Sequence, residues 1–359
     1  MQEKINEKTF EGQSIYVGID VHKKDWKVTI MTAEVSYKTF SAVPKTEKLG
    51  AYLKSNFPGA TYYSAYEAGF SGFWLHKELT ALGINSIVVN PADIPTTDKE
   101  RKQKEDLRDS RKIAQSLRSG QLKGIYIPNE ATQNDRLLLR ARHAMVKDLN
   151  RSKNRIKSML FFLGVPLPDR FFARGCGWSK PFIKWLEELS LEYPTAKSAL
   201  DAHLDQVRHL RSSVLKLTRQ INELSRSNRY KENAVLLICI PGIGTLTAMM
   251  LLTEFEDIKR FKDFDELCSF VGLVPSTSSS GENDITTGIT PRRNGRLRSA
   301  LIESAWVAIR NDPALLSSYQ SLTKRMPGNK AIVRIAKKLL RRMVQVLRNK
   351  KSYEKGVIK

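Results

Sequence analysis

Residues 14–32, SIYVGIDVHKKDWKVTIMT, decide the fold of the N-terminal part of this chain. The stretch begins with a short run of apolar, β-prone residues that ends on a carboxylate, Asp20. A second run of this kind extends from Trp26 to Thr32, after the polar residues VHKKD. Two β-prone runs separated by a short polar segment predict a β-hairpin, so we expect an acidic side chain at the end of its first strand.

Further strands and helices follow this hairpin in alternation. We expect strands at residues 35–42, 61–67 and 84–90, and helices at 46–57 and 72–82. The strand at 61–67, TYYSAYE, again ends on a carboxylate, Glu67. The order β-β-β-α-β-α-β is then followed by a helix that includes QKEDLRDSRKIA (103–114) and ends near Gly120. This order predicts an α/β domain with a mixed sheet.

The charges on the helix around residues 103–114 need an explanation. Asp106 and Asp109 are three residues apart, so their carboxylates share one helix face, and Lys and Arg residues surround them. One interpretation is charge balance on a solvated helix. The other is a divalent cation, with Asp20 and Glu67 within reach at the strand ends. Four carboxylates without metal would repel one another by roughly 4 kcal/mol per close pair, and one or two Mg²⁺ ions would remove that penalty.

The whole chain has a strong excess of basic residues. Its 359 residues include 60 Lys and Arg against 37 Asp and Glu, which gives a formal net charge of +23. Such a charge favours a polyanionic partner, and nucleic acid is the commonest one in a cell. The 3 cysteines and 5 histidines show neither a disulfide framework nor a metal-ligand spacing. The polar N-terminus and the lack of long apolar runs predict a cytosolic chain without a signal peptide or membrane span.

Two long helices are expected in the middle of the chain, at residues 130–163 and about 196–227. The second helix carries apolar residues at coiled-coil spacing: Leu210, Val214, Leu217, Ile221 and Leu224. Two interpretations stay open. The helices form either an antiparallel hairpin within one chain or a seam between two chains.

Three segments follow in the C-terminal part. Residues 236–254, LLICIPGIGTLTAMMLLTE, predict two apolar helices broken by a turn that contains Gly242 and Gly244. The turn either binds phosphate through backbone N–H groups, as helix-hairpin-helix modules do, or serves as a connector. Residues 276–298, STSSSGENDITTGITPRRNGRLR, lack apolar periodicity and are expected to be a surface loop. A basic amphipathic helix is expected at 331–349.

Several of these motifs together resemble one family. YVGIDVHKKDW, AYEAGFSGFWLHKEL, VVNPADIP and KEDLRDSRKIA resemble the RuvC/RNase H-like domain of DEDD transposases, specifically the IS110 family. ICIPGIGTLTAMMLLTEFEDIKRFKDFDELCSFVGLVPSTSSSG and GITPRRNGRLRSALIESAW resemble the family's C-terminal transposase domain, in the family's order. The resemblance implies an α/β plus all-α chain. It divides into an RNase H-like domain at 1–129, a helical or coiled-coil region at 130–230, a transposase domain at 231–325 and a basic helix and tail at 326–359.

The resemblance also assigns roles to residues. It implies metal binding by Asp20, Glu67, Asp106 and Asp109, and a nucleophilic serine at Ser280, which precedes a glycine. By residue chemistry alone Ser276, Ser278 and Ser279 are equivalent candidates. Four arginines are candidate phosphate contacts or surface ion pairs: Arg292, Arg293, Arg296 and Arg298. Arg292-Arg293-Asn294-Gly295 departs from the family's usual lysine-glycine-asparagine, and Arg293 adopts positive φ less easily than glycine.

The function that the resemblance implies is a transposase, a site-specific recombinase of an insertion sequence. It would cut and rejoin DNA through a phosphoserine intermediate, aided by Mg²⁺ or substituting Mn²⁺. Its expected partners are the element ends and target DNA, a bridge-type guide RNA, and further copies of the chain in a dimer or tetramer. The expected location is the prokaryotic cytoplasm, at the nucleoid. Two alternatives remain: a metal-dependent Holliday-junction-type endonuclease that uses water, and a non-catalytic nucleic-acid-binding scaffold.

Overall fold

The computed structural model of the chain consists of two compact units, Met1–Ile127 and Pro128–Lys359. It describes residues 9–95, 106–171, 177–280, 283–289 and 294–356, and within these it leaves the side chains of 106–107, 275–280 and 283–289 undescribed. Each unit has its own apolar core. The four-part division expected from the sequence stays a prediction.

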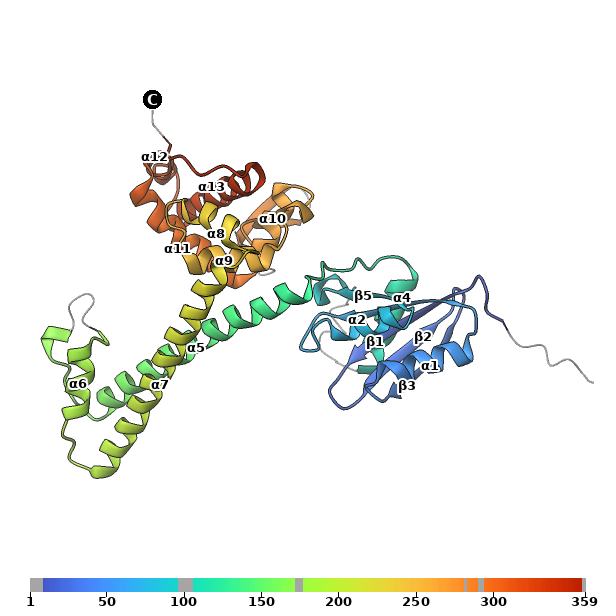
Figure 1. The fold of residues 1–359 in the computed structure, drawn as a ribbon, viewed down its shortest axis with the longest axis horizontal. Coiled ribbons are helices and arrows are strands. Elements are labelled where there is room, and N and C mark those ends of the chain that lie inside the picture. Colours follow the sequence, from blue (N-terminus) through green and yellow to red (C-terminus); the bar gives the residue numbers. More distant parts are fainter. Residues whose placement is uncertain (1–8, 96–105, 172–176, 281–282, 290–293, 357–359) are drawn as a thin grey trace, which may run out of the picture. The chain divides into compact units, whose positions relative to one another are not determined.

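The first unit is built on a five-stranded mixed sheet (Figure 1). Its strands are β1 (Ser14–Val21), β2 (Trp26–Met31), β3 (Ser36–Ala42), β4 (Thr61–Glu67) and β5 (Asn85–Val89), in the order β3-β2-β1-β4-β5. The first three pair antiparallel through short turns, whereas β1, β4 and β5 pair parallel. Parallel pairing requires crossover connections, which α1 (Thr46–Asn56) and α2 (Trp74–Ala81) provide. The predicted order of strands and helices along the chain and the predicted mixed sheet are confirmed.

Helices cover both faces of this sheet. On one face, Ile15, Val17 and Ile19 of β1 share a core with the leucines of α1 and α2. On the other face lies α4 (Asp106–Arg118), where Ile113 packs against Ala65 of β4 and Val89 of β5. Because strand side chains alternate between the faces, Gly18 lies on the face of β1 that α4 covers.

The docking of α4 onto the sheet depends on Gly18. A Cβ atom built at this glycine would lie 2.1 Å from the Ser110 carbonyl oxygen and 2.4 Å from the Ala114 backbone nitrogen. Thr29, which pairs with Gly18 across β1 and β2, places its Oγ1 2.9 Å from the buried Ser110 Oγ. The helix backbone therefore lies directly on the strand, and a buried hydroxyl pair fixes its register.

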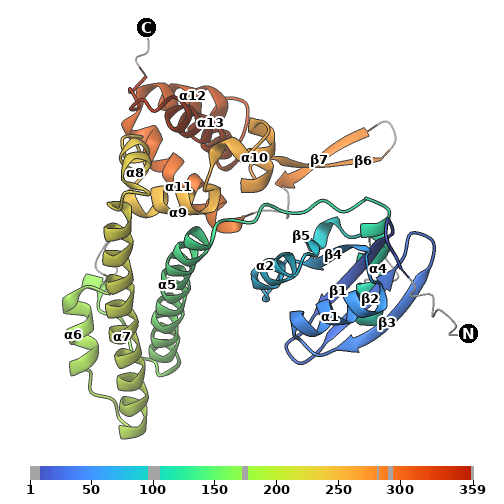
Figure 2. The same ribbon diagram turned by 45° about the vertical axis from the view of Figure 1, so that its right-hand side comes forward.

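The second unit begins with a long helical hairpin. It consists of α5 (Glu130–Phe162) and α7 (Pro194–Ser225), with α6 (Lys180–Glu188) packed at its far end (Figure 2). Ser152 Oγ of α5 donates to Gln206 Oε1 at 3.0 Å, and Arg142 Nε donates to Thr218 Oγ1 at 2.8 Å. In these two contacts the residue number rises along α5 as it falls along α7. The two helices are therefore antiparallel within one chain, as one of the two interpretations predicts.

The remainder of the second unit is a helical body. Its helices are α8 (Lys231–Ile238), α9 (Thr245–Phe255), α10 (Phe264–Val271), α11 (Gly295–Asn311), α12 (Pro313–Thr323) and α13 (Gly328–Asn349). They share one core, to which α13 contributes its whole apolar face, including Ile335, Leu339 and Met343. The prediction of a turn between two apolar helices is confirmed at Pro241–Gly244, whereas α6, α10, α11 and α12 are helices that were not predicted.

The expectation of a surface loop at residues 276–298 is wrong. Strands β6 (Pro275–Ser280) and β7 (Asn283–Ile289) form an antiparallel ribbon, and α11 begins at Gly295. A two-stranded ribbon is held by backbone hydrogen bonds and needs no periodic apolar face. The β-branched residues Ile285, Thr286 and Thr287 also favour an extended backbone.

Within the described residues, no helix combines the length and the apolar composition that crossing a bilayer requires.

Substitution Gly18→Ala tests the close approach of α4. The added Cβ would overlap the helix backbone, so we expect the free energy of unfolding to fall by about 3 kcal/mol. Urea unfolding followed by circular dichroism measures this change. Gly69→Ala is the matched control, because a Cβ there would meet no atom within 4 Å. Equal unfolding midpoints for the two variants would contradict the docking described for α4.

Candidate functional site

Two acidic residues predicted from the sequence lie at neighbouring strand ends. Strands β1 and β4 pair in parallel with Ile19 opposite Tyr66, so the next positions, Asp20 and Glu67, are side by side. Because side chains alternate between the two faces of a sheet, both residues lie on the face that α4 covers. The structure therefore brings Asp20 and Glu67 to one edge of the sheet, as predicted.

The carboxylate of Asp20 has a close polar neighbour. His22 Nε2 lies 3.0 Å from Asp20 Oδ2. An imidazole with a proton on Nε2 donates a hydrogen bond across this distance and restrains the carboxylate rotamer. The sequence analysis gave no role to His22.

The other two acidic candidates are on α4. Asp109 directly precedes Ser110, whose carbonyl oxygen contacts β1 at Gly18, and its side chain is half-buried. Asp106 is the first residue of the helix, and its side chain is outside the described part of the chain. The backbone thus places these acidic positions on an element fixed to the strand that ends in Asp20.

These residues have the donor chemistry that a hard divalent cation requires, because carboxylate oxygens are the preferred ligands of Mg²⁺. Among the side chains that the structure describes, however, no three acidic, His or Cys groups converge closely enough to hold a metal ion. The shared strand edge supports a metal site, but the joint role of Asp20, Glu67, Asp106 and Asp109 stays a prediction.

The proposed nucleophile lies at the tip of the β6–β7 ribbon. Ser280 is the last residue of β6 and pairs with Asn283 of β7. Its side chain is outside the described part, as are the side chains of Ser276, Ser278 and Ser279. Arg292 and Arg293 also lie outside the described residues.

The turn at Pro241–Gly244 contacts α11. Gly242 has a φ of +88°, and a Cβ atom there would lie 2.2 Å from the carbonyl oxygen of Ser304. Gly244 is exposed at the N-terminus of α9, and a Cβ there would meet no atom within 4 Å. Gly242 is therefore required for packing, and of the two glycines Gly244 is the one open to a ligand.

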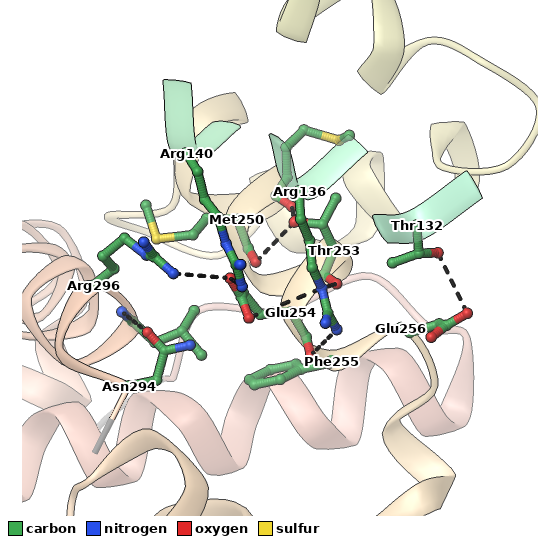
Figure 3. A network of polar contacts seen from close by, with 12 residues as sticks. Thr132, Arg136, Arg140, Met250, Thr253, Glu254, Phe255, Glu256, Asn294 and Arg296 are labelled. Atoms are coloured by element: carbon green, nitrogen blue, oxygen red, sulfur yellow. Dashed lines mark hydrogen bonds and ion pairs between the residues drawn. The ribbon is translucent and has the colours of Figure 1, made fainter. Parts of the chain in front are cut away.

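Arg296 and Arg298, candidates for phosphate contacts or surface ion pairs, lie in the first turns of α11. The side chain of Arg298 is half-buried. Arg296 belongs to a network around the buried carboxylate of Glu254, together with Arg136 and Arg140 of α5 (Figure 3).

This network was not predicted from the sequence. Its only signals in the sequence are one acidic residue at the end of an apolar helix and two arginines one turn apart on α5. The two arginines of α5 are more than 100 residues from Glu254 in the chain, so no local pattern pairs them with it.

The surroundings of Arg296 are electropositive. Burial and the neighbouring Arg140 guanidinium lower the pKa of Arg296, while Glu254 acts in the opposite direction. The pKa of His143 on α5 is also below its usual value, because of burial and the positive charges of Lys147, Arg296 and Arg142. Both groups therefore lose protons more easily than in water, first because burial disfavours their charged forms and second because neighbouring cations repel the added charge.

The architecture of the first unit defines its class. A mixed sheet of order β3-β2-β1-β4-β5, with helices on both faces and acidic residues at the ends of β1 and β4, is an RNase H-like, RuvC-like domain. A mainly helical unit follows it.

Two family models match the chain in this order. The DEDD transposase model of IS110 matches residues 17–163, and the model of the transposase IS116/IS110/IS902 family matches residues 234–320. Together they include more than half of the chain. The chain belongs to the IS110 family of transposases.

Individual relatives agree with this assignment. The transposase for insertion sequence element IS1533 of Leptospira borgpetersenii is 27% identical over 360 residues, which cover 97% of this chain and 99% of the relative. The transposase for IS1111A of Coxiella burnetii is 23% identical, over 90% of this chain and 86% of the relative. The putative transposase y4qE of Sinorhizobium fredii is 29% identical, over 68% of this chain and 58% of the relative.

Membership in this family has three consequences. The chain belongs to a class of enzymes that process DNA, and it binds DNA. Its DEDD domain implies a divalent metal ion.

The two turn glycines can be separated by experiment. Gly242→Ala introduces a clash with α11 at a positive φ, so we expect the free energy of unfolding to fall by at least about 3 kcal/mol. Gly244→Ala adds a methyl group in open space at a normal φ and is expected to cost less than about 1 kcal/mol. Thermal unfolding of both variants checks this. A similar loss of stability in both would show that the turn does not depend on Gly242.

Proposed function

We propose that this transposase cuts and rejoins DNA through a covalent bond between Ser280 and a DNA phosphate. The Ser280 hydroxyl loses its proton and its Oγ bonds to phosphorus. The bond from phosphorus to a sugar oxygen breaks, and that oxygen gains a proton and leaves as a sugar hydroxyl. Rejoining reverses these changes, so the phosphodiester is restored without an external energy source. The excised or inserted DNA would be the insertion sequence itself.

The observation that carries the proposal is the register of the parallel strands. It sets Asp20 and Glu67 side by side on the sheet face where α4 carries Asp109. We assign Mg²⁺, with Mn²⁺ as a substitute, to these three residues and Asp106. A bound divalent ion there would stabilise negative charge on a phosphate oxygen. The carboxylates would hold the ion, and His22 lies within hydrogen-bond distance of Asp20 to restrain it.

Helix α13 supports the binding of nucleic acid. Its 22 residues include no acidic residue. Its solvent-exposed side carries five cations that share one face: Lys330, Arg334, Lys338, Arg341 and Arg348. Exposed cations in a row contribute sequence-independent affinity for a phosphate backbone.

The remaining parts of the proposal follow from the family resemblance and the net charge. Target choice is assigned to base pairing with a bridge-type guide RNA, and a charge of +23 favours holding RNA and DNA together. Recombination of two duplexes requires more than one cleavage, which favours a dimer or tetramer. We also propose the domain division at residues 129, 230 and 325, and a place at the nucleoid.

Trapping of a protein–DNA adduct tests the nucleophile. We expect a covalent adduct on a denaturing gel after incubation with DNA of the element's ends, its flanking RNA and Mg²⁺. Ser280→Ala should abolish the adduct, because it removes the oxygen that bonds to phosphorus. Ser279→Ala is the matched control and should retain it.

Other outcomes of this experiment favour the alternatives. Cleavage without an adduct, retained in Ser280→Ala and lost in Asp20→Ala, would favour the endonuclease that uses water. Binding without any dependence on Mg²⁺ or Mn²⁺ beyond ionic screening would favour the scaffold.

Calorimetric titration with Mn²⁺ tests the metal site separately. Asp20→Asn and Glu67→Gln each remove one negative ligand, so we expect Mn²⁺ affinity to fall at least about tenfold. Asp25→Asn is the control in the same hairpin, because Asp25 pairs with Lys27 at 2.5 Å. A similar affinity in all three variants would contradict a metal site at the strand ends.

A further inference from the structure

Three arginines surround one buried carboxylate in the second unit. Glu254, in the last turn of α9, has a side chain that is only 8% exposed. Its Oε1 lies 3.1 Å from Arg140 Nη2 and 3.7 Å from Arg296 Nη2, and its Oε2 lies 3.9 Å from Arg136 Nε (Figure 3). Three guanidinium groups thus surround one carboxylate, so the cluster has an excess of positive charge.

Arg136 has a structural task in this group. Its Nε donates to the Thr253 carbonyl oxygen at 2.7 Å and its Nη2 to the Glu254 carbonyl oxygen at 3.0 Å. Arg260 donates in the same way to Phe255 O at 2.9 Å. These bonds satisfy carbonyl groups at the end of α9, which have no partner within the helix. Arg136 is 11% exposed, so its guanidinium is largely committed to the helix end.

Arg140 and Arg296 are different. Both approach the same oxygen, Glu254 Oε1, and their side chains remain 43% and 36% exposed. A guanidinium has five N–H donors, and one carboxylate oxygen satisfies few of the ten that these two groups offer. Glu254 thus holds two cationic side chains side by side, and each of them remains at least about a third exposed.

The backbone holds Arg296 in the first turn of α11, the helix that follows the β6–β7 ribbon in the chain. Asn294, which follows the ribbon, donates its backbone N–H to Phe270 O at 3.2 Å and caps α11 by accepting from Leu297 N at 3.3 Å. Arg296 is two residues further along, and Leu297 is fully buried in the core. The position of Arg296 is therefore set by the capping and packing of the first turn of α11.

We propose that Arg140 and Arg296, held together by Glu254, form a clamp for one backbone phosphate of DNA bound at the β6–β7 ribbon. Two guanidinium groups that share one carboxylate have the charge and the free donors that a phosphate requires. The choice of DNA rests on the proposed function, which places the reacting serine on that ribbon. Glu254 is a positioning residue in this clamp, and Arg140 and Arg296 are the binding residues.

Salt-dependent DNA binding tests the clamp. The measurement uses the full chain in a Ser280→Ala background, so binding is independent of the chemical step, with a fluorescein-labelled DNA duplex. Arg140→Gln and Arg296→Gln should each weaken binding about tenfold and lower the slope of log affinity against log salt by about one. The double variant should lose less affinity for DNA than the product of the two single-variant losses, because both side chains contact one phosphate.

Matched variants exclude general effects of charge and stability. Arg155→Gln removes one exposed cation from the same helix, outside the network, and gives the baseline. Arg136→Gln should lower the melting temperature without changing the salt slope of the folded protein. If the Arg140 and Arg296 variants change affinity and slope no more than Arg155→Gln, the clamp is excluded. A loss seen with structured RNA and not with the DNA duplex would overturn the assignment to DNA.

Glu254→Gln tests the positioning role, with the melting temperature used to confirm that the protein is folded. The variant loses a negative charge, so a general electrostatic effect would strengthen DNA binding, as Glu256→Gln at the C-terminal cap of α9 is expected to do modestly. Loss of positioning should instead weaken binding several-fold. Unchanged or tighter binding would exclude that role. Adduct formation by Ser280 is measured separately, so failure of the recombinase proposal and failure of the clamp are distinguishable.

Discussion

The contact between α4 and Gly18 is the constraint on which the candidate metal site depends. With only hydrogen at this position, the helix backbone lies on β1, and the Thr29–Ser110 hydroxyl pair fixes its register. Asp20 lies two residues beyond Gly18 on the same face of the strand, and Asp109 directly precedes Ser110. The acidic positions are therefore held by a strand and a packed helix, which position ligands more accurately than loops do.

The second unit uses the same physical device. Gly242 allows the turn before α9 to contact the backbone of α11 at Ser304. In both units a missing Cβ allows close backbone packing against a helix, and in both the residues with proposed chemistry lie in that helix's first turns. Asp109 is near the start of α4, and Arg296 is near the start of α11. Packing of the helix fixes these first turns while leaving them at the edge of the core.

The sequence predicts those features that depend on local pattern. Alternating and apolar runs locate the five strands, and the acidic ends of β1 and β4 are visible because each terminates such a run. The β6–β7 ribbon escapes prediction because backbone hydrogen bonds, which any sequence offers, hold it together. The Glu254 network is not predictable from local sequence, because its residues come from α5, α9 and α11 and only tertiary packing brings them together. The adjacency of Asp20 and Glu67 required the parallel register as well as the motifs.

The stability of the fold does not by itself explain why an acidic side chain is buried at Glu254. Removing a carboxylate and guanidinium groups from water costs free energy that their attraction only partly returns, so buried ion pairs contribute little net stability. The end of α9 is already capped by Arg136 and Arg260 through backbone carbonyls. The carboxylate additionally restrains the positions of the Arg140 and Arg296 guanidinium groups. Each free arginine has about 2 kcal/mol of side-chain conformational entropy to lose on binding a ligand. A carboxylate that restrains both side chains in advance lowers that cost at the moment of binding, and this is the physical reason to expect an anion at this place.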